Sequence, residues 1–147
     1  MKSLLLTLSL FIISPDLFSQ SIIIGEDNVV RCKDISIGTT QVIFGKTYTV
    51  VDRNLLEQRL NEGFDPSLLC VSNITDMSEL FAGTSFPFVR RNTFNEDISS
   101  WDISGVTDMS KMFWYSEFNK PIGNWDVSNV VNMSNLFYGS LFNQDIS

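Results

Sequence analysis

The segment Val71–Phe81 reads VSNITDMSELF, and similar segments follow at Ile103–Phe113 (ISGVTDMSKMF) and Val127–Phe137 (VSNVVNMSNLF). Trp101 and Trp125 precede the second and third copies and lie 24 residues apart. A fixed period of roughly 20 to 50 residues is typical of proteins whose repeats stack only on their neighbours. Such a chain presents an extended surface rather than an enclosed pocket, which favours binding or display over catalysis.

A second phrase follows each copy: FNEDIS at 94–99, FNKPIG at 118–123 and FNQDIS at 142–147. We expect a short strand near Asp97–Ser99 and its counterparts. We also expect a helical turn or short helix near Ser110–Tyr115, with Ser110 or Asp108 as its cap. In the first unit Leu69 stands where the spacing predicts the Trp.

The first unit is eight residues longer than the others, and the surplus lies within Ala82–Thr93. Insertions into repeats form loops on the surface. Aromatic and Arg side chains are favoured at interfaces, so the candidate partner-binding residues are Phe86, Phe88, Arg90 and Arg91 in the insertion, with Trp114 and Tyr115, which do not recur as a pair. The alternative is ordinary loop packing beside a solvated charge pair.

The N-terminus predicts export. Met1–Ser3 carries a positive charge, an apolar run of about ten residues follows, and Ser19 marks a plausible cleavage site. The run is short of the ~20 residues that a transmembrane anchor needs. We therefore expect a signal peptide at residues 1–20, no transmembrane segment elsewhere, and a secreted or cell-surface protein.

The formal net charge is −7, and the longest basic run is Arg90–Arg91. Because binding to phosphates needs clustered Lys and Arg, this composition argues against a nucleic-acid partner. The two cysteines, Cys32 and Cys70, are an even number in a chain expected to be exported, which favours a disulfide between them. The alternative is two buried free thiols.

Residues 21–67 contain no repeat and predict an N-terminal cap for the repeat array. The expected elements are strands at Ile22–Ile24 and Val29–Cys32, a hairpin of Gln41–Phe44 and Thr47–Val51 around Gly45–Lys46, and a helix at Arg53–Glu62 capped by Asp52 and ended by Gly63. The repeats occupy 68–147 as about three units. Because no closing cap follows them, we expect an incomplete, longer array. The predicted fold class is α+β: a small hairpin and helix cap followed by a solenoid of about 24-residue units.

The recurring carboxylates suggest two kinds of chemistry, and both are weakly supported. Calcium takes oxygen ligands, but no EF-hand or glycine-rich nonapeptide spacing is present. Paired carboxylates also serve glycosidases, although recurrence in every unit indicates a structural role. The sequence has no histidine, which removes Ser-His and Cys-His nucleophiles. We therefore expect no catalytic residues, no metal site and no cofactor.

The phrases WDISGVTDMSKMF at 101–113 and FNEDIS at 94–99 resemble the repeats of the BspA-family leucine-rich-repeat surface proteins of bacteria. The resemblance covers roughly residues 68–147. It implies a leucine-rich-repeat-like solenoid and a non-catalytic secreted or cell-surface protein, with an adhesion-like role toward an extracellular protein or glycan. The alternative is a targeting or substrate-binding module of a larger secreted enzyme.

Overall fold

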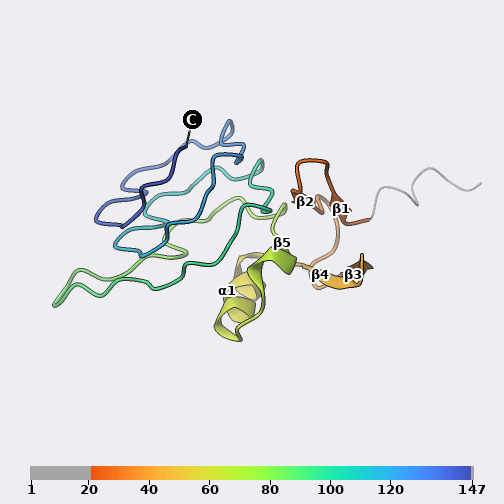
Figure 1. The fold of residues 1–147 in the computed structure, drawn as a ribbon, viewed down its shortest axis with the longest axis horizontal. Helices are drawn as coiled ribbons and strands as arrows, with labels where there is room; N and C mark the ends of the chain where they lie inside the picture. The colour runs from red at the N-terminus through yellow and green to blue at the C-terminus, as the bar shows by residue number, and fades with distance from the viewer. Residues whose placement is uncertain (1–20, 147) are drawn as a thin grey trace, which may run out of the picture.

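The protein is described from a computed structural model that covers residues 21–146; the predicted signal peptide at 1–20 lies outside the described residues. Within them, the helices and strands all lie between residues 23 and 70 (Figure 1). In chain order they are β1 (Ile23–Ile24), β2 (Val30–Arg31), β3 (Thr40–Ile43), β4 (Lys46–Val50), α1 (Arg53–Asn61), the 3-10 helix η2 (Pro66–Leu68) and β5 (Leu69–Cys70). This region is a small mixed α+β unit, with β1–β2 as one sheet and β3–β4–β5 as another.

The predicted hairpin is present as β3 and β4, which pair antiparallel with Ile43 opposite Lys46. The turn residues are Phe44 and Gly45, at φ 51° and 78°, rather than the predicted Gly45 and Lys46. Two residues with positive φ give the turn the twist that matches the flanking strands. Gly45 meets this requirement without steric cost, whereas Phe44 is an uncommon residue there.

Helix α1 forms within one residue of its predicted bounds. Its cap is Asp52, whose Oδ1 accepts the Leu55 N–H at 2.8 Å. At the other end Gly63, at φ 78°, donates to the Leu60 carbonyl at 3.1 Å, as a left-handed residue after a helix commonly does. Leu56 is fully buried, and Leu55 and Leu60 pack beside it against the core of the first repeat.

Cys32 and Cys70 form the predicted disulfide, with 6.2 Å between their Cα atoms. Strand β5 brings Cys70 into place by pairing parallel to β4, where Val50 lies opposite it. Both cysteines are buried in a small cluster that includes Val30 and Tyr48. The bridge therefore joins the segment after β2 to the beginning of the first repeat, and the alternative of two free thiols is wrong.

One pattern of backbone hydrogen bonds joins successive repeats. Alternate N–H groups of one repeat donate to alternate carbonyls of the next. From the first repeat to the second the pairs are Met77–Asp108, Glu79–Ser110, Phe81–Met112 and Gly83–Trp114, and from the second to the third they are Met109–Asn132, Lys111–Ser134, Phe113–Leu136 and Tyr115–Tyr138, at 2.7–3.0 Å. We name this arrangement the repeat ladder. In Figure 1 its segments run side by side to the C-terminus.

Two predictions about the repeats are wrong. Asp97–Ser99 forms no strand, and Ser110–Tyr115 forms consecutive turns rather than a helix. Lys111 and Tyr115 have φ of 54° and 46°, which an α-helix does not allow. Within each repeat, N–H groups donate to the carbonyl three residues earlier and so close four-residue turns. The parallel bridges between repeats lie at Asp76–Asp108, Asp108–Asn132 and Asn92–Ser116 instead.

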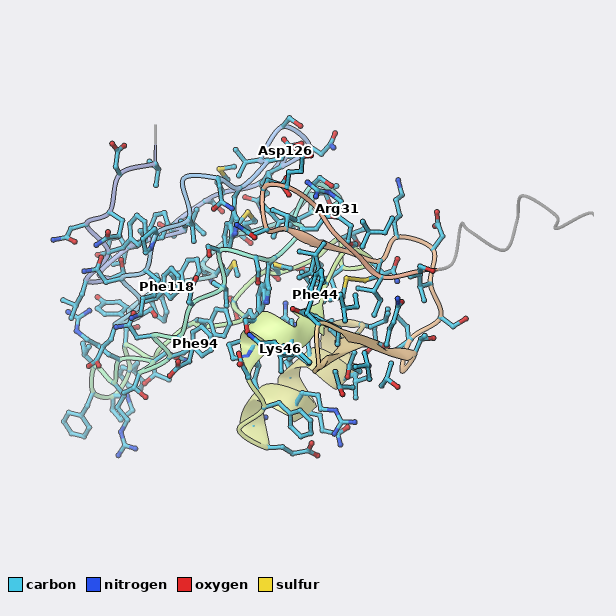
Figure 2. All side chains as sticks on the ribbon, turned by 45° about the vertical axis from the view of Figure 1, so that its right-hand side comes forward. Arg31, Phe44, Lys46, Phe94, Phe118 and Asp126 are labelled. Carbon is cyan, nitrogen blue, oxygen red and sulfur yellow. A yellow bond between two sulfur atoms is a disulfide. The ribbon has the colours of Figure 1, made fainter. Side chains whose placement is uncertain are left out.

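Aromatic rings fill the interior in two columns. The members are Phe81, Phe113 and Phe137 in one column, and Phe94, Phe118 and Phe142 in the other. Successive ring centroids are 5.7 and 5.5 Å apart in the first column and 6.3 and 6.2 Å apart in the second. Figure 2 labels two members of the second column, Phe94 and Phe118. Each repeat thus adds equivalent rings to a shared core.

Leu69, Trp101 and Trp125 occupy equivalent buried positions, which confirms the predicted replacement of Trp by Leu in the first unit. The backbone N–H of each donates to the carbonyl three residues earlier. The indole N–H groups continue the equivalence, since Trp101 donates to the Pro66 carbonyl at 2.9 Å and Trp125 to the Ile98 carbonyl at 3.3 Å. The register predicted from the spacing is therefore the register of the fold.

Candidate binding surface

The surplus residues of the first repeat, 82–93, form a projecting hairpin (Figure 1, the long green loop). Thr84 and Arg90 exchange two backbone hydrogen bonds of 2.8 and 2.9 Å, which close its stem. At its base the Gly83 N–H donates to the Trp114 carbonyl at 2.7 Å, and the Asn92 N–H donates to the Tyr115 carbonyl at 3.0 Å. The hairpin is therefore fixed at both ends to the second repeat.

Gly83 is required for this attachment. A Cβ added there would lie 2.4 Å from the carbonyl oxygens of both Arg90 and Tyr115, closer than any side chain tolerates. The close backbone approach at the base of the hairpin therefore depends on a residue without a side chain.

The tip of the projecting hairpin is apolar and exposed. Phe86 is 88% exposed, Phe88 is 76% exposed and Val89 is 54% exposed. A single exposed apolar residue is ordinary on a protein surface, whereas adjacent large ones indicate a contact site. The insertion is thus an exposed loop, as the sequence predicts.

The same hairpin is basic in an acidic protein. Residues 82–93 contain Arg90 and Arg91 and no Asp or Glu, whereas the whole chain has a net charge of −7. Arg90 is exposed, and within residues 21–146 its side chain forms no ion pair or hydrogen bond. Arg91 instead donates to the Gly139 carbonyl of the third repeat. One arginine is therefore structural and the other is available to a partner.

Trp114 and Tyr115 lie half-buried beside the base of the hairpin. The Tyr115 ring meets Trp114 edge-on at 4.7 Å and Tyr138 at 5.7 Å. Tyr138 is 58% exposed. Sequence reasoning did not select it, although it follows Phe137 just as Trp114 follows Phe113 in the second repeat. The three rings of Trp114, Tyr115 and Tyr138 therefore form an aromatic surface that continues from the second repeat into the third.

The structure brings some of the predicted residues together and separates others. Arg91 meets the aromatic surface because Gly139, its partner, packs against the Tyr115 ring. In the described part of the chain no ring contact links Phe86 or Phe88 to the Trp114–Tyr115 pair. We define the hairpin surface as the residues Phe86, Phe88, Arg90, Arg91, Trp114, Tyr115 and Tyr138.

The repeated aspartates organise turns. Oδ1 of Asp97, Asp108 and Asp126 accepts the backbone N–H of the serine two residues later, at 2.7–3.0 Å. Hydrogen bonds from these serines hold the pKa of all three carboxyls below its ordinary value. Asn132 takes the position of Asp108 in the third repeat and accepts the Ser134 N–H in the same way. A neutral acceptor therefore suffices at this turn.

Two findings concern other kinds of site. Over residues 21–146, no three His, Cys, Asp or Glu side chains gather where they could hold a metal ion. In that same part of the chain, no helix has the length and apolar character needed to cross a bilayer.

A family described as "Mycoplasma protein of unknown function, DUF285" matches residues 58–147. The match begins within α1 and includes the whole repeat ladder and the projecting hairpin. No curated protein and no solved structure matches the chain.

Proposed function

This chain belongs to the DUF285 family, and from that premise we propose that it is a non-catalytic, exported repeat protein that binds a macromolecule through its hairpin surface. The observation that carries the proposal is the tip of the projecting hairpin, where Phe86 and Phe88 are exposed on a stem that is fixed at both ends. An apolar tip carried on a fixed stem loses less conformational entropy on binding than a free loop would, which favours affinity.

The proposed fold of residues 68–147 is a leucine-rich-repeat-like solenoid related to the BspA-type surface proteins. Three features support it: the period of 24 residues between Trp101 and Trp125, the repeat ladder, and the aromatic columns. Each repeat contacts mainly its neighbours, as in other linear repeat arrays. The surface grows with each repeat, and an insertion in one repeat can project without disturbing the others.

Export is the second part of the proposal. The disulfide between Cys32 and Cys70 supports it, because disulfides persist in oxidising compartments outside the cytosol. The apolar run after Lys2 supplies the signal. Mass spectrometry of protein from the exterior of its native cell should find an N-terminus near Gln20 or Ser21. An intact Met1 on the mature protein would contradict export.

The expected partner is an extracellular protein or glycan, to be sought with a panel of immobilised matrix proteins and an oligosaccharide array. The test variant is Phe86→Ser with Phe88→Ser. The two Phe side chains should contribute about 2 kcal/mol or more in total to the free energy of binding, so their loss should weaken binding about 30-fold or more. The matched control is Val131→Ser, which removes an equally exposed apolar side chain (88%) from the third repeat. Equal affinities for both variants would remove the hairpin from the binding site.

The second candidate is a targeting or substrate-binding module of a larger secreted enzyme. The same hairpin surface would then bind that enzyme's substrate. Expression of the complete gene product distinguishes the two: an attached catalytic domain whose activity on insoluble substrate falls with the Phe86 and Phe88 changes would favour the module.

A further inference from the structure

The first repeat exposes one edge of the repeat ladder to the cap. In the second repeat the carbonyls at 108, 110, 112 and 114 accept N–H groups from the preceding repeat. The equivalent carbonyls of the first repeat are those of Asp76, Ser78, Leu80 and Ala82. No repeat precedes them, so their donors come from the cap, from water or from a ligand.

The cap supplies two of these donors through one side chain. Arg53, at the first turn of α1, donates from one guanidinium nitrogen to the Asp76 carbonyl at 3.1 Å and from another to the Ser78 carbonyl at 2.9 Å. An ion pair with Glu57, one turn further along the helix, holds the guanidinium in place. A planar guanidinium therefore spans two successive acceptors of this edge, as its fork of donors allows.

The next two acceptors have no such partner. Within residues 21–146 no donor bonds to the carbonyl of Leu80 or Ala82. Leu80 lines a cleft of about 580 Å³ between α1 and the first repeat. That volume is in the range of ligand sites. The Leu80 end of the unused edge therefore lies beside a space large enough for a side chain and its backbone.

The walls of the cleft suit a flat cation. Phe94 is half-buried there and stacks on Phe81 with 3.9 Å between ring centroids. The charged side chains that line the cleft are Arg53, Glu57, Glu79 and Glu96. Glu57 already pairs with Arg53, and Glu79 pairs with Lys111 at 3.0 Å. Within the described residues Glu96 forms no ion pair, which leaves its carboxylate available.

We propose that this cleft binds an arginine side chain of an extended peptide. The incoming guanidinium repeats the arrangement of Arg53 one step along the edge: it donates to the Leu80 and Ala82 carbonyls, faces the Phe94 ring and pairs with Glu96. Guanidinium groups favour both aromatic faces and carboxylates. The site is separate from the hairpin surface and does not depend on the proposed function.

The test uses the protein from Ser21 to Ser147 and the peptide acetyl-Gly-Ser-Arg-Ser-Gly-amide, titrated by NMR. The expected result is shift changes at Leu80, Phe94 and Glu96. The matched peptide with citrulline, which keeps the shape and removes the charge, should bind at least about tenfold more weakly, as expected for the loss of a charge-assisted pair. Equal binding of the citrulline peptide, or no binding of the arginine peptide, would overturn the proposal.

A variant pair locates the site. Glu96→Gln should weaken the arginine peptide at least about fivefold, whereas Glu26→Gln, an exposed change in the cap outside the cleft, should leave it unchanged. Melting temperatures of both variants should equal that of the parent. Equal affinities of the two variants, or stronger shifts at the same residues with cellotriose than with the peptide, would contradict the assignment. Phe86→Ser with Phe88→Ser should retain peptide binding, which separates this site from the hairpin surface.

Discussion

The cap and the repeats satisfy their backbone hydrogen-bonding groups in different ways. In residues 21–67, β3 and β4 pair with each other and α1 bonds internally, and a disulfide holds this unit to Cys70 of the first repeat. In residues 71–146 the structure assigns no helix or extended strand, yet within the repeat ladder alternate N–H groups donate to the next repeat. Regular structure in the repeats is therefore a property of the stack and not of any one segment.

The difference implies different sources of stability. A second, small buried cluster surrounds Cys32 and Val50 of the cap and includes Cys70 at the beginning of the first repeat. The repeats share a continuous core with Leu56 of α1 at one end and Trp125 toward the other. Trp101 connects the two regions, because it bridges to Val30 of the cap and also lies in the shared core. A change at Trp101 should therefore affect both regions at once.

The largest expected effect is that of Trp101→Ala. Its side chain is 1% exposed and its indole N–H is bonded to Pro66, so truncation should lower the free energy of unfolding by about 3–5 kcal/mol. Trp125→Ala should cost less, because Trp125 is 8% exposed and lies nearer the end of the core. Urea unfolding measures both, with Val131→Ala as the control within about 0.5 kcal/mol of the parent. A larger loss at Trp125 than at Trp101 would contradict the shared core.

The next effect is that of removing the disulfide. Cys32→Ser with Cys70→Ser opens a loop of 38 residues, which should cost roughly 3–4 kcal/mol in the chain-entropy model. Amide exchange should accelerate in β2 and β4 more than at Met109, Lys111 and Phe113, whose N–H groups belong to the repeat ladder. A uniform acceleration across both regions would show that the cap and repeats unfold as one unit.

A smaller effect is expected at the contact between the two regions. Arg53→Gln removes two hydrogen bonds to the first repeat, and these should be worth about 1 kcal/mol in all because the side chain is partly exposed. Lys33→Gln is the control, an exposed cation without a hydrogen bond or ion pair in the described residues. Thermal unfolding compares the two. Equal melting temperatures would mean that the hydrogen bonds of Arg53 to the Asp76 and Ser78 carbonyls do not contribute to stability.

The smallest effect concerns pH and the turns. Because hydrogen bonds lower the folded pKa of Asp108, its contribution to stability is present above the ordinary carboxyl pKa of about 4 and is lost as pH falls through the lowered value. Asp108→Asn should preserve stability at pH 7, since Asn132 already serves in the third repeat. It should also reduce the fall in melting temperature below about pH 4. An unchanged acid response would exclude Asp108 from the pH dependence.

Much of the cap was predictable because its signals are local. Asp52 and Gly63 mark the ends of α1, and β-branched residues flank Gly45 in the hairpin. The repeat register was predictable for another reason: Trp101 and Trp125 recur at a fixed spacing, and a shared core requires equivalent residues at equivalent positions. The backbone conformation within the repeats was not predictable. Lys111 and Tyr115 adopt positive φ, and nothing in the sequence indicates this because Lys and Tyr usually favour negative φ.

The features of the candidate sites also divide into those that the sequence predicts and those that only the fold decides. The sequence alone determined the period, the disulfide partners and the insertion with its exposed aromatic residues, because each depends on residue type and spacing. Only the tertiary structure decided that Arg91 reaches Gly139, that Tyr138 extends the aromatic surface, and that Arg53 takes two carbonyls of the first repeat. The physical reason is that these contacts join residues 23 to 48 positions apart, whose meeting is fixed by the stacking of repeats and not by local preference.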